Sequence, residues 1–124
     1  MKFNDTQPIF VQITNLLYER ILAGDWIPGD RIPSVRDLAI ELEVNPNTVM
    51  RTYDRLQSTE VIINKRGIGY YLDEQAHQKV LDIRRTEFMV AELPVLIKNM
   101  QLLGITPAEI ELFYNQKSNT SNDK

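Results

Sequence analysis

The sequence predicts a mainly α-helical chain that contains one small β-hairpin. Two helix starts lie close together, two short apolar runs around a Gly-containing turn follow them, and a long helical pattern comes next. From Ile32 to Leu72 these elements follow one another with almost no spare residues, which is the layout of a winged helix-turn-helix. The later pattern predicts a C-terminal helical segment that serves dimerisation.

Both helices of the predicted pair have clear start signals. Ser34 can cap the free backbone amides of the first helix, and the side chain of Asp37, three residues on, can bond back to the amide of Ser34. The second helix follows Asn45, a favourable N-cap, and has Pro46 at its first position, where the missing N–H costs nothing. Two starts this close leave room only for a tight turn.

The second helix has one apolar and one polar face. At about 100° per residue, Val49, Tyr53 and Leu56 fall on one side. Amide, hydroxyl and charged groups lie opposite or at the flanks, on Asn47, Arg51, Asp54, Ser58, Thr48 and Arg55. Arginine binds guanine edges, asparagine pairs with adenine, and threonine serves bases or phosphates. An ordinary solvated face is the plain alternative, but the hairpin that follows favours DNA.

The predicted hairpin after the second helix is typical of the wing of a winged helix-turn-helix. Residues 61–63 and 70–72 predict strands, and the residues between them predict a turn. Gly67 and Gly69 permit positive φ and a close approach of the backbone to another surface. Two positive charges lie near the tip, on Lys65 and Arg66.

The flanking segments complete the predicted winged domain. Residues 8–23 predict a first helix with Gly24 as its C-cap. Residues 31–32 could add a short third strand to the wing sheet. Trp26 lies beside Ile27 and a turn, so we expect it in the core rather than stacked on a base.

A long helical pattern runs from Glu74 to about Leu103 and ends at Gly104. Pro94 should bend or divide it near Leu93. The helix is apolar on two faces, one with Ile83, Val90 and Ile97, the other with Leu81, Phe88 and Val95. Its own chain can cover one face, and the other needs a partner.

A last helix begins at Thr106-Pro107 with a capping box and can cover one face of its predecessor. We therefore predict a winged helix-turn-helix DNA-binding domain over 1–73 and a helical dimerisation segment over 74–116. Residues 117–124 are polar and lack periodicity, so we predict a flexible tail there.

Composition narrows the class of protein. The 124 residues contain no cysteine and one histidine, His77, which argues against a disulfide scaffold or a metal site. There is no Gly-rich phosphate loop and no His-based acid–base pair, so we predict no enzyme and no cofactor. No apolar run approaches the roughly 20 residues that span a bilayer, and the first residues do not form a signal peptide, so we expect a cytoplasmic protein.

The net charge of −3 is unusual for a DNA-binding protein. Phosphates respond to local charge over a Debye length of about 8 to 10 Å, however, so acidic residues on a far side are screened. A winged helix used as a protein-interaction module, without DNA binding, is the alternative that the acidic balance favours. The positive charges of the wing favour DNA over that alternative.

Several motifs together resemble a known family. Residues 33–39, residues 44–49 with Arg51 and Tyr53, and residues 66–70 are similar to the DNA-binding domain of GntR-type bacterial repressors. The match covers roughly residues 8–72 and most resembles the YtrA-like subfamily, whose members carry a small helical dimerisation segment. Other branches of the family place an arginine where Met50 stands, so base contacts of those branches are not carried over to this chain. Asp54 is not a candidate contact, because phosphate would repel its carboxylate unless it lies outside the groove or pairs with Arg51 or Arg55.

The resemblance implies roles for individual residues. Arg36 would contact phosphate or base, Asn47, Thr48 and Arg51 would belong to the recognition helix, and Arg66, Gly67 and Gly69 would belong to the wing. With the two caps and the flanking cations, the candidates for DNA contact are Ser34, Arg36, Asn45, Asn47, Thr48, Arg51, Arg55, Lys65, Arg66, Gly67 and Gly69.

The expected function is that of a homodimeric, sequence-specific transcriptional regulator, a repressor, on a near-palindromic operator in double-stranded DNA. The resemblance implies control of an ABC transporter operon and of the protein's own promoter. A small-molecule effector, if one exists, would use a dimer crevice lined by Phe88, Met89, Met100 or Tyr114.

Overall fold

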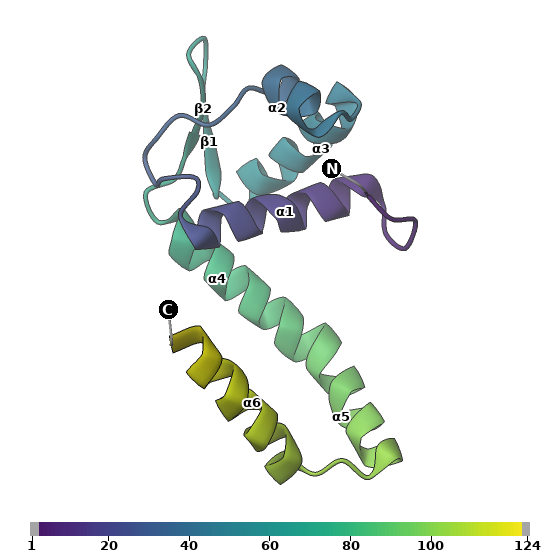
Figure 1. Cartoon of the computed structure of the whole chain (residues 1–124). Coiled ribbons are helices and arrows are strands. Elements are labelled where there is room, and N and C mark those ends of the chain that lie inside the picture. Colours follow the sequence, from purple (N-terminus) through teal and green to yellow (C-terminus); the bar gives the residue numbers. More distant parts are fainter. Residues whose placement is uncertain (1–2, 123–124) are drawn as a thin grey trace. The chain divides into compact units, whose positions relative to one another are not determined.

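The computed structural model describes residues 3–122, with side chains to 118. It confirms a mainly helical chain with one two-stranded antiparallel sheet. The chain divides into two compact units between Ile83 and Arg84, and we describe each by itself. The first, called the winged unit below, contains three helices, the hairpin and the first turns of a fourth helix (Figure 1). The second, called the C-terminal unit, contains the remaining helical turns.

The three helices of the winged unit begin and end where the sequence places its caps. α1 (Ile9–Ala23) ends at Gly24, whose φ of +83° is the left-handed conformation that favours glycine. α2 (Val35–Leu42) begins at Ser34, whose hydroxyl oxygen accepts a hydrogen bond from the Asp37 amide at 3.1 Å.

The turn of the helix-turn-helix lies between α2 and α3 (Pro46–Ser58). Glu43 closes α2 in the left-handed region, with φ +56°, a conformation that costs a non-glycine residue about 1 kcal/mol. Asn45 then caps α3, because its side-chain oxygen accepts from the Asn47 amide at 2.8 Å. Pro46 fills the first helical position, as predicted. The two helices pack directly on each other.

The hairpin is longer than the predicted strands. β1 (Ile62–Lys65) pairs antiparallel with β2 (Gly69–Leu72), so Lys65 and Gly69, expected in the turn, form the last pair of the ladder. Only residues 66–68 form the tip. The predicted third strand is reduced to one bridge between Arg31 and Tyr71, supported by a bond from the Ile32 amide to the Tyr70 carbonyl at 2.9 Å.

A single apolar core joins these elements. It contains the inner faces of the three helices and of the hairpin: Ile13, Leu17, Tyr18, Ile21, Ile32, Leu38, Ala39, Leu42, Val49, Tyr53, Leu56, Val61, Ile62, Leu72, Ala76 and Val80. Trp26 is half-buried against this core, as predicted.

Tyr53 joins three parts of the winged unit. Its hydroxyl donates to the Pro33 carbonyl before α2 at 2.6 Å, and its ring meets that of Tyr70 in β2 edge-on at 4.9 Å between centroids. Burial raises the pKa of the Tyr53 phenol, followed in effect by the neighbouring Tyr70. The neutral phenol is therefore the form that the fold requires.

Replacing Tyr53 with Phe should lower the free energy of unfolding by about 1–3 kcal/mol, because the Pro33 carbonyl loses its partner. The raised pKa means that the stabilising contribution of the neutral phenol is complete below the ordinary tyrosine pKa of about 10 and is lost as the pH rises above it. Urea melts at pH 7 and above pH 10 test both points. The role assigned to the Tyr53 hydroxyl would be contradicted if Tyr53→Phe were as stable as the wild type at pH 7. It would also be contradicted if the free energy of unfolding fell as much above pH 10 in the variant as in the wild type.

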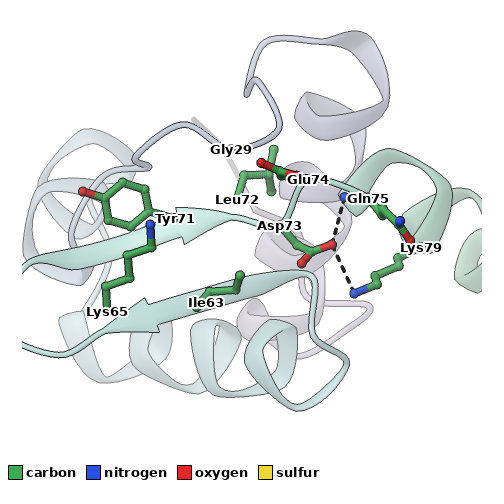
Figure 2. Close-up of a pocket in the computed structure, with 9 residues that line it drawn as sticks. All are labelled: Gly29, Ile63, Lys65, Tyr71, Leu72, Asp73, Glu74, Gln75 and Lys79. Carbon is green, nitrogen blue, oxygen red and sulfur yellow. Dashed lines mark hydrogen bonds and ion pairs between the residues drawn. The ribbon is translucent and has the colours of Figure 1, made fainter.

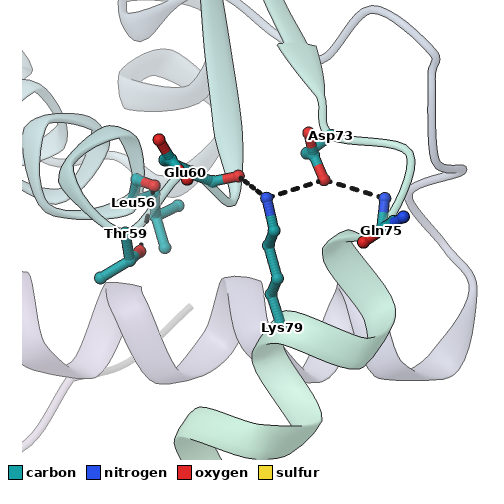
Figure 3. Close-up of polar contacts among 6 residues, drawn as sticks. All are labelled: Leu56, Thr59, Glu60, Asp73, Gln75 and Lys79. Carbon is teal, nitrogen blue, oxygen red and sulfur yellow. Dashed lines mark hydrogen bonds and ion pairs between the residues drawn. The ribbon is translucent and has the colours of Figure 1, made fainter.

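The first turns of α4 (Ala76–Glu87) belong to the winged unit rather than to a separate segment starting at residue 74. Ala76 and Val80 are buried in its core. Figure 3 shows the Lys79 ammonium between the Glu60 carbonyl and the Asp73 carboxylate, at 3.1 Å from each. This clamp attaches the first turns of α4 to the winged unit.

The C-terminal unit begins with a helix that changes its winding at the predicted place. η1 (Phe88–Glu92) is a π-helical turn, closed by a bond from the Leu93 amide to the Phe88 carbonyl, and α5 (Leu93–Leu103) follows it. Pro94 has no N–H to donate into the preceding turn, so the wider π turn accommodates its ring. Gly104, with φ +70°, ends α5 as predicted.

The last helix, α6 (Pro107–Asn122), differs from expectation in two ways. The capping box is present, since the Thr106 hydroxyl and the Glu109 carboxylate exchange bonds of 3.3–3.4 Å with each other's amides. The helix continues through Asn122, past residue 117 where the flexible tail is predicted to begin, while 123–124 lie outside the described residues. Among its described side chains, Leu112 and Phe113 are two-thirds exposed, so α6 does not cover a face of α5. No described helix is both long and apolar enough to cross a bilayer.

Candidate nucleic-acid interface

The two faces of α3 are those that the periodicity predicts. Val49, Tyr53 and Leu56 are completely buried. The opposite side is open to solvent and carries Asn47, Arg51, Asp54 and Ser58, with Arg55 exposed and Thr48 half-buried at the flanks. A helix held by one face in a core therefore presents a row of hydrogen-bonding groups outward, which is the arrangement a recognition helix needs in a major groove.

Met50 also lies on this exposed side, with 41% of its surface accessible. It is next to the polar row and is not among the predicted DNA contacts. A thioether cannot form two parallel hydrogen bonds to a guanine, but an exposed apolar side chain can contact a thymine methyl group. Its helical position, one turn beyond Asn47, is the sequence signal for this exposure.

Arg51 is held on one side by an aromatic ring from another helix. Its guanidinium carbon lies 4.0 Å from the centroid of the Phe10 ring at the start of α1, and that of Arg55 lies 5.7 Å from the same centroid. The Thr52 hydroxyl, on the inner side of α3, bonds the Phe10 carbonyl at 3.2 Å. The N-terminal turn of α1 is therefore attached to α3 directly beneath the arginines.

The two caps among the candidate residues are only partly free for DNA. The oxygens of Ser34 and Asn45 already accept bonds from their own helices. A hydroxyl proton and an amide NH₂ group still remain as donors for phosphate. Arg36 lies exposed in the first turn of α2, where the free amides and the dipole of the helix favour a phosphate.

At the wing, Arg66 and Gly67 lie at the exposed tip, and Gly67 has the predicted positive φ, +77°. Gly69 has φ +142°, and a Cβ there would come within 2.9 Å of Arg31 Nε. Gly69 thus makes room for the Arg31 side chain as well as adopting a glycine conformation. Arg31 lies in the short third strand suggested at residues 31–32 but is not among the predicted DNA contacts, and its bridge to Tyr71 brings it to the wing.

Lys65 points to the same side of the hairpin as Tyr71. Its ammonium lies 4.1 Å from the centroid of the Tyr71 ring (Figure 2). These two residues line a cavity of about 420 Å³ at the base of the wing, together with Asp73 and Lys79. Asp73 already accepts bonds from Lys79 and from the Gln75 amide, so this wall of the cavity joins the hairpin to α4.

The cations of the interface are available for an external anion. Within the described residues, Arg36, Arg51 and Arg66 form no ion pair, whereas Arg20, on α1, pairs with Glu41. Asp54 has no ion-pair partner there either, although it shares the exposed side of α3 with Arg51. The carboxylate is therefore a local source of repulsion toward phosphate.

Replacing Arg66 with Gln should weaken binding to all DNA sequences by a similar factor and reduce the slope of log affinity against log salt by about one, because one phosphate contact is lost. Lys65→Gln should do the same to a smaller extent, since its ammonium already rests on the Tyr71 ring. Fluorescence anisotropy at four salt concentrations measures both slopes. A change in base preference without a change in slope would contradict this assignment.

Taken together, a capped pair of helices, an exposed polar face on the second and a basic hairpin define a winged helix-turn-helix protein of the DNA-binding class. The model of the bacterial regulatory proteins of the gntR family matches residues 10–72. The chain belongs to this family and is a helix-turn-helix transcriptional regulator with a DNA-binding fold.

Its similarity to individual proteins extends beyond that domain. YhcF, an HTH-type transcriptional regulator of Bacillus subtilis (strain 168), is 33% identical over 109 residues, or 88% of each chain. The HTH-type transcriptional repressor YtrA of the same strain is 36% identical over 98 residues, covering 79% of this chain and 75% of YtrA. A solved GntR family transcriptional regulator from Listeria monocytogenes has a TM-score of 0.78 at 34% identity, covering 92% of this chain and 98% of that one.

Proposed function

We propose that the protein is a homodimeric repressor that binds a near-palindromic operator, with one α3 in the major groove of each half-site. The observation that carries the proposal is the solvent-exposed row on α3, where Asn47 and Arg51 stand beside each other on a helix fixed by its buried side. Arg36 and Arg66 would hold phosphates on either side of that groove. Such a protein acts in the cytoplasm, where bacterial DNA is found.

The C-terminal unit supports the dimer. No residue of η1 or α5 is buried, although most of their side chains are apolar. Large apolar side chains remain exposed on the described part of the unit: Phe88, Met89, Val90, Val95, Leu96, Ile97, Leu102, Leu103, Ile110, Leu112, Phe113 and Tyr114. About forty residues cannot bury such a surface by themselves, so a second copy is the partner that we propose.

The six residues predicted for dimerisation are not equivalent in the structure. Ile83 packs half-buried against the core of the winged unit, and Leu81 is half-buried. Phe88, Val95 and Ile97 are exposed by 43–57%, and Val90 by 72%. We therefore place the centre of the proposed interface on η1 and α5 rather than on α4.

Repression is supported by the similarity to YtrA, which is described as a repressor. We further propose that the operator lies upstream of the protein's own gene and controls an ABC transporter operon. An effector, if present, would enter the cavity of about 380 Å³ between Arg84, Arg85, Phe88, Met89 and Glu92 in the C-terminal unit. Phe88 and Met89 are two of the four residues expected to line such a crevice, and Met100 and Tyr114 do not line this cavity.

Selection of bound duplexes from a random pool tests the function without knowledge of the genome. We expect an enriched sequence with two inverted half-sites, separated by about one helical turn or a multiple of it. Affinity for that duplex should fall steeply with salt, because each bound phosphate releases counterions. If no sequence were enriched, and if DNA binding were weak and independent of salt concentration, the alternative of a protein-interaction module would be favoured instead.

A further inference from the structure

Phe10 is placed where its ring can support Arg51, an exposed arginine on the outward side of α3. Its ring lies 4.0 Å from the Arg51 guanidinium carbon, which is within the range of a cation–π contact. Arg51 as a whole remains exposed despite this contact, so the ring lies against the guanidinium without burying the side chain. The ring comes from α1, a helix that otherwise packs beneath α3.

The ring of Phe10 is not part of the core. The half-buried apolar side chains that pack against the core are Phe3, Leu16, Leu22, Trp26, Val35, Val44, Tyr70 and Ile83, and Phe10 is not among them. The Phe10 backbone is instead held by its carbonyl, which accepts from the Thr14 hydroxyl at 2.7 Å and from the Thr52 hydroxyl at 3.2 Å. The main chain is thus fixed by two hydrogen bonds that do not involve the ring.

A fixed guanidinium plane matters for base recognition. Arginine reads guanine by two parallel N–H donors, and this geometry requires one orientation of a planar group on a flexible side chain. Ordering that side chain upon binding costs conformational entropy. A ring that already supports the guanidinium in the free protein removes part of that cost.

We propose that Phe10 is a positioning residue for Arg51, and that stacking on its ring sets the preference of the protein for the base pair that Arg51 reads. The inference rests on the proposed function, since it concerns the same face of α3. Arg55 lies at 5.7 Å from the same centroid and serves as the comparison, because a weaker contact should matter less.

The test is a double-mutant cycle of Phe10→Leu and Arg51→Ala, measured on the selected operator, on the same duplex with the base pair read by Arg51 changed, and on unrelated DNA. Phe10→Leu should reduce the discrimination between the first two duplexes by about two- to tenfold. Binding to unrelated DNA and the salt slope should stay within twofold of the wild type. Phe10→Tyr should restore discrimination, and Phe10→Leu should have no further effect in the Arg51→Ala background.

Equal losses in both backgrounds, or no loss at all, would overturn the proposal. A wild type that shows no preference for any duplex would remove the proposed function itself, which distinguishes the two failures. Thermal melts establish that the variants fold, and Phe10→Met replaces Phe10→Leu if the latter does not. Independently of DNA, the Arg51 side-chain NMR signals should be shifted upfield by the ring in the free wild type. Normal shifts there would also overturn the proposal.

Discussion

Replacement of Arg51 with Ala is expected to weaken operator binding by about 1–3 kcal/mol, or roughly 5- to 150-fold. The residue lies exposed on α3, supported by the Phe10 ring and without an ion-pair partner in the described part of the chain. Its loss would remove the bidentate base contact that we propose for this residue. The base preference at one position of each half-site should relax as well.

Arg55→Ala is the matched control for this variant. It removes the same charge from the same helix, but at the flank of the exposed row and with a longer distance to Phe10. We expect a smaller loss that is shared by all DNA sequences, because a flanking cation contacts phosphate rather than bases. Anisotropy titrations on operator and single-base variants measure both. If Arg51→Ala and the wild type had the same base preference, Arg51 would not be the residue by which α3 recognises bases.

Replacement of Val90 with Glu is expected to have the largest effect on DNA binding. Val90 is 72% exposed in η1, so the change should not destabilise a separate protomer, but it would place a charge inside the proposed dimer interface. Without a dimer, the second winged unit is no longer tethered to its half-site, and the gain from linked binding, about 10²- to 10⁴-fold, is lost.

Sedimentation velocity at micromolar concentration should therefore show a monomer for Val90→Glu and a dimer for the wild type. The operator affinity of the variant should be lower by about 10²- to 10⁴-fold. His77→Glu is the control, since it also introduces a negative charge at an exposed position, but on α4 and outside the proposed interface. We expect it to remain dimeric. A dimeric Val90→Glu protein that still binds the operator tightly would move the interface away from η1.

The residues at which helices of this fold begin and end could be predicted from the sequence. Ser34, Asn45 and Gly24 each act through neighbours in the chain, so their hydrogen bonds and dihedral angles follow from short-range sequence. The two faces of α3 were predictable for the same reason, because helical periodicity alone decides which side chains point to the core.

What the sequence did not predict depends on contacts between distant segments. The pairing of Lys65 with Gly69 extends the hairpin through hydrogen bonds that no local pattern specifies, and only one bridge, from Arg31, forms of the third strand suggested at residues 31–32. The start of α4 is attached to the winged unit by Lys79, which binds the Glu60 carbonyl nineteen residues away. The contact of Phe10 with Arg51 likewise joins two helices, and only the folded chain brings ring and guanidinium together.

The central claim is that the outward side of α3 lies in the major groove of a two-fold operator. Hydroxyl-radical footprinting of the DNA upstream of the protein's own gene tests it most directly, with wild type and Arg51→Ala side by side. We predict two protected half-sites on one face of the duplex, related by inverted symmetry, which weaken together in the variant. Protection of a single asymmetric site, or a footprint that Arg51→Ala leaves unchanged, would contradict the claim.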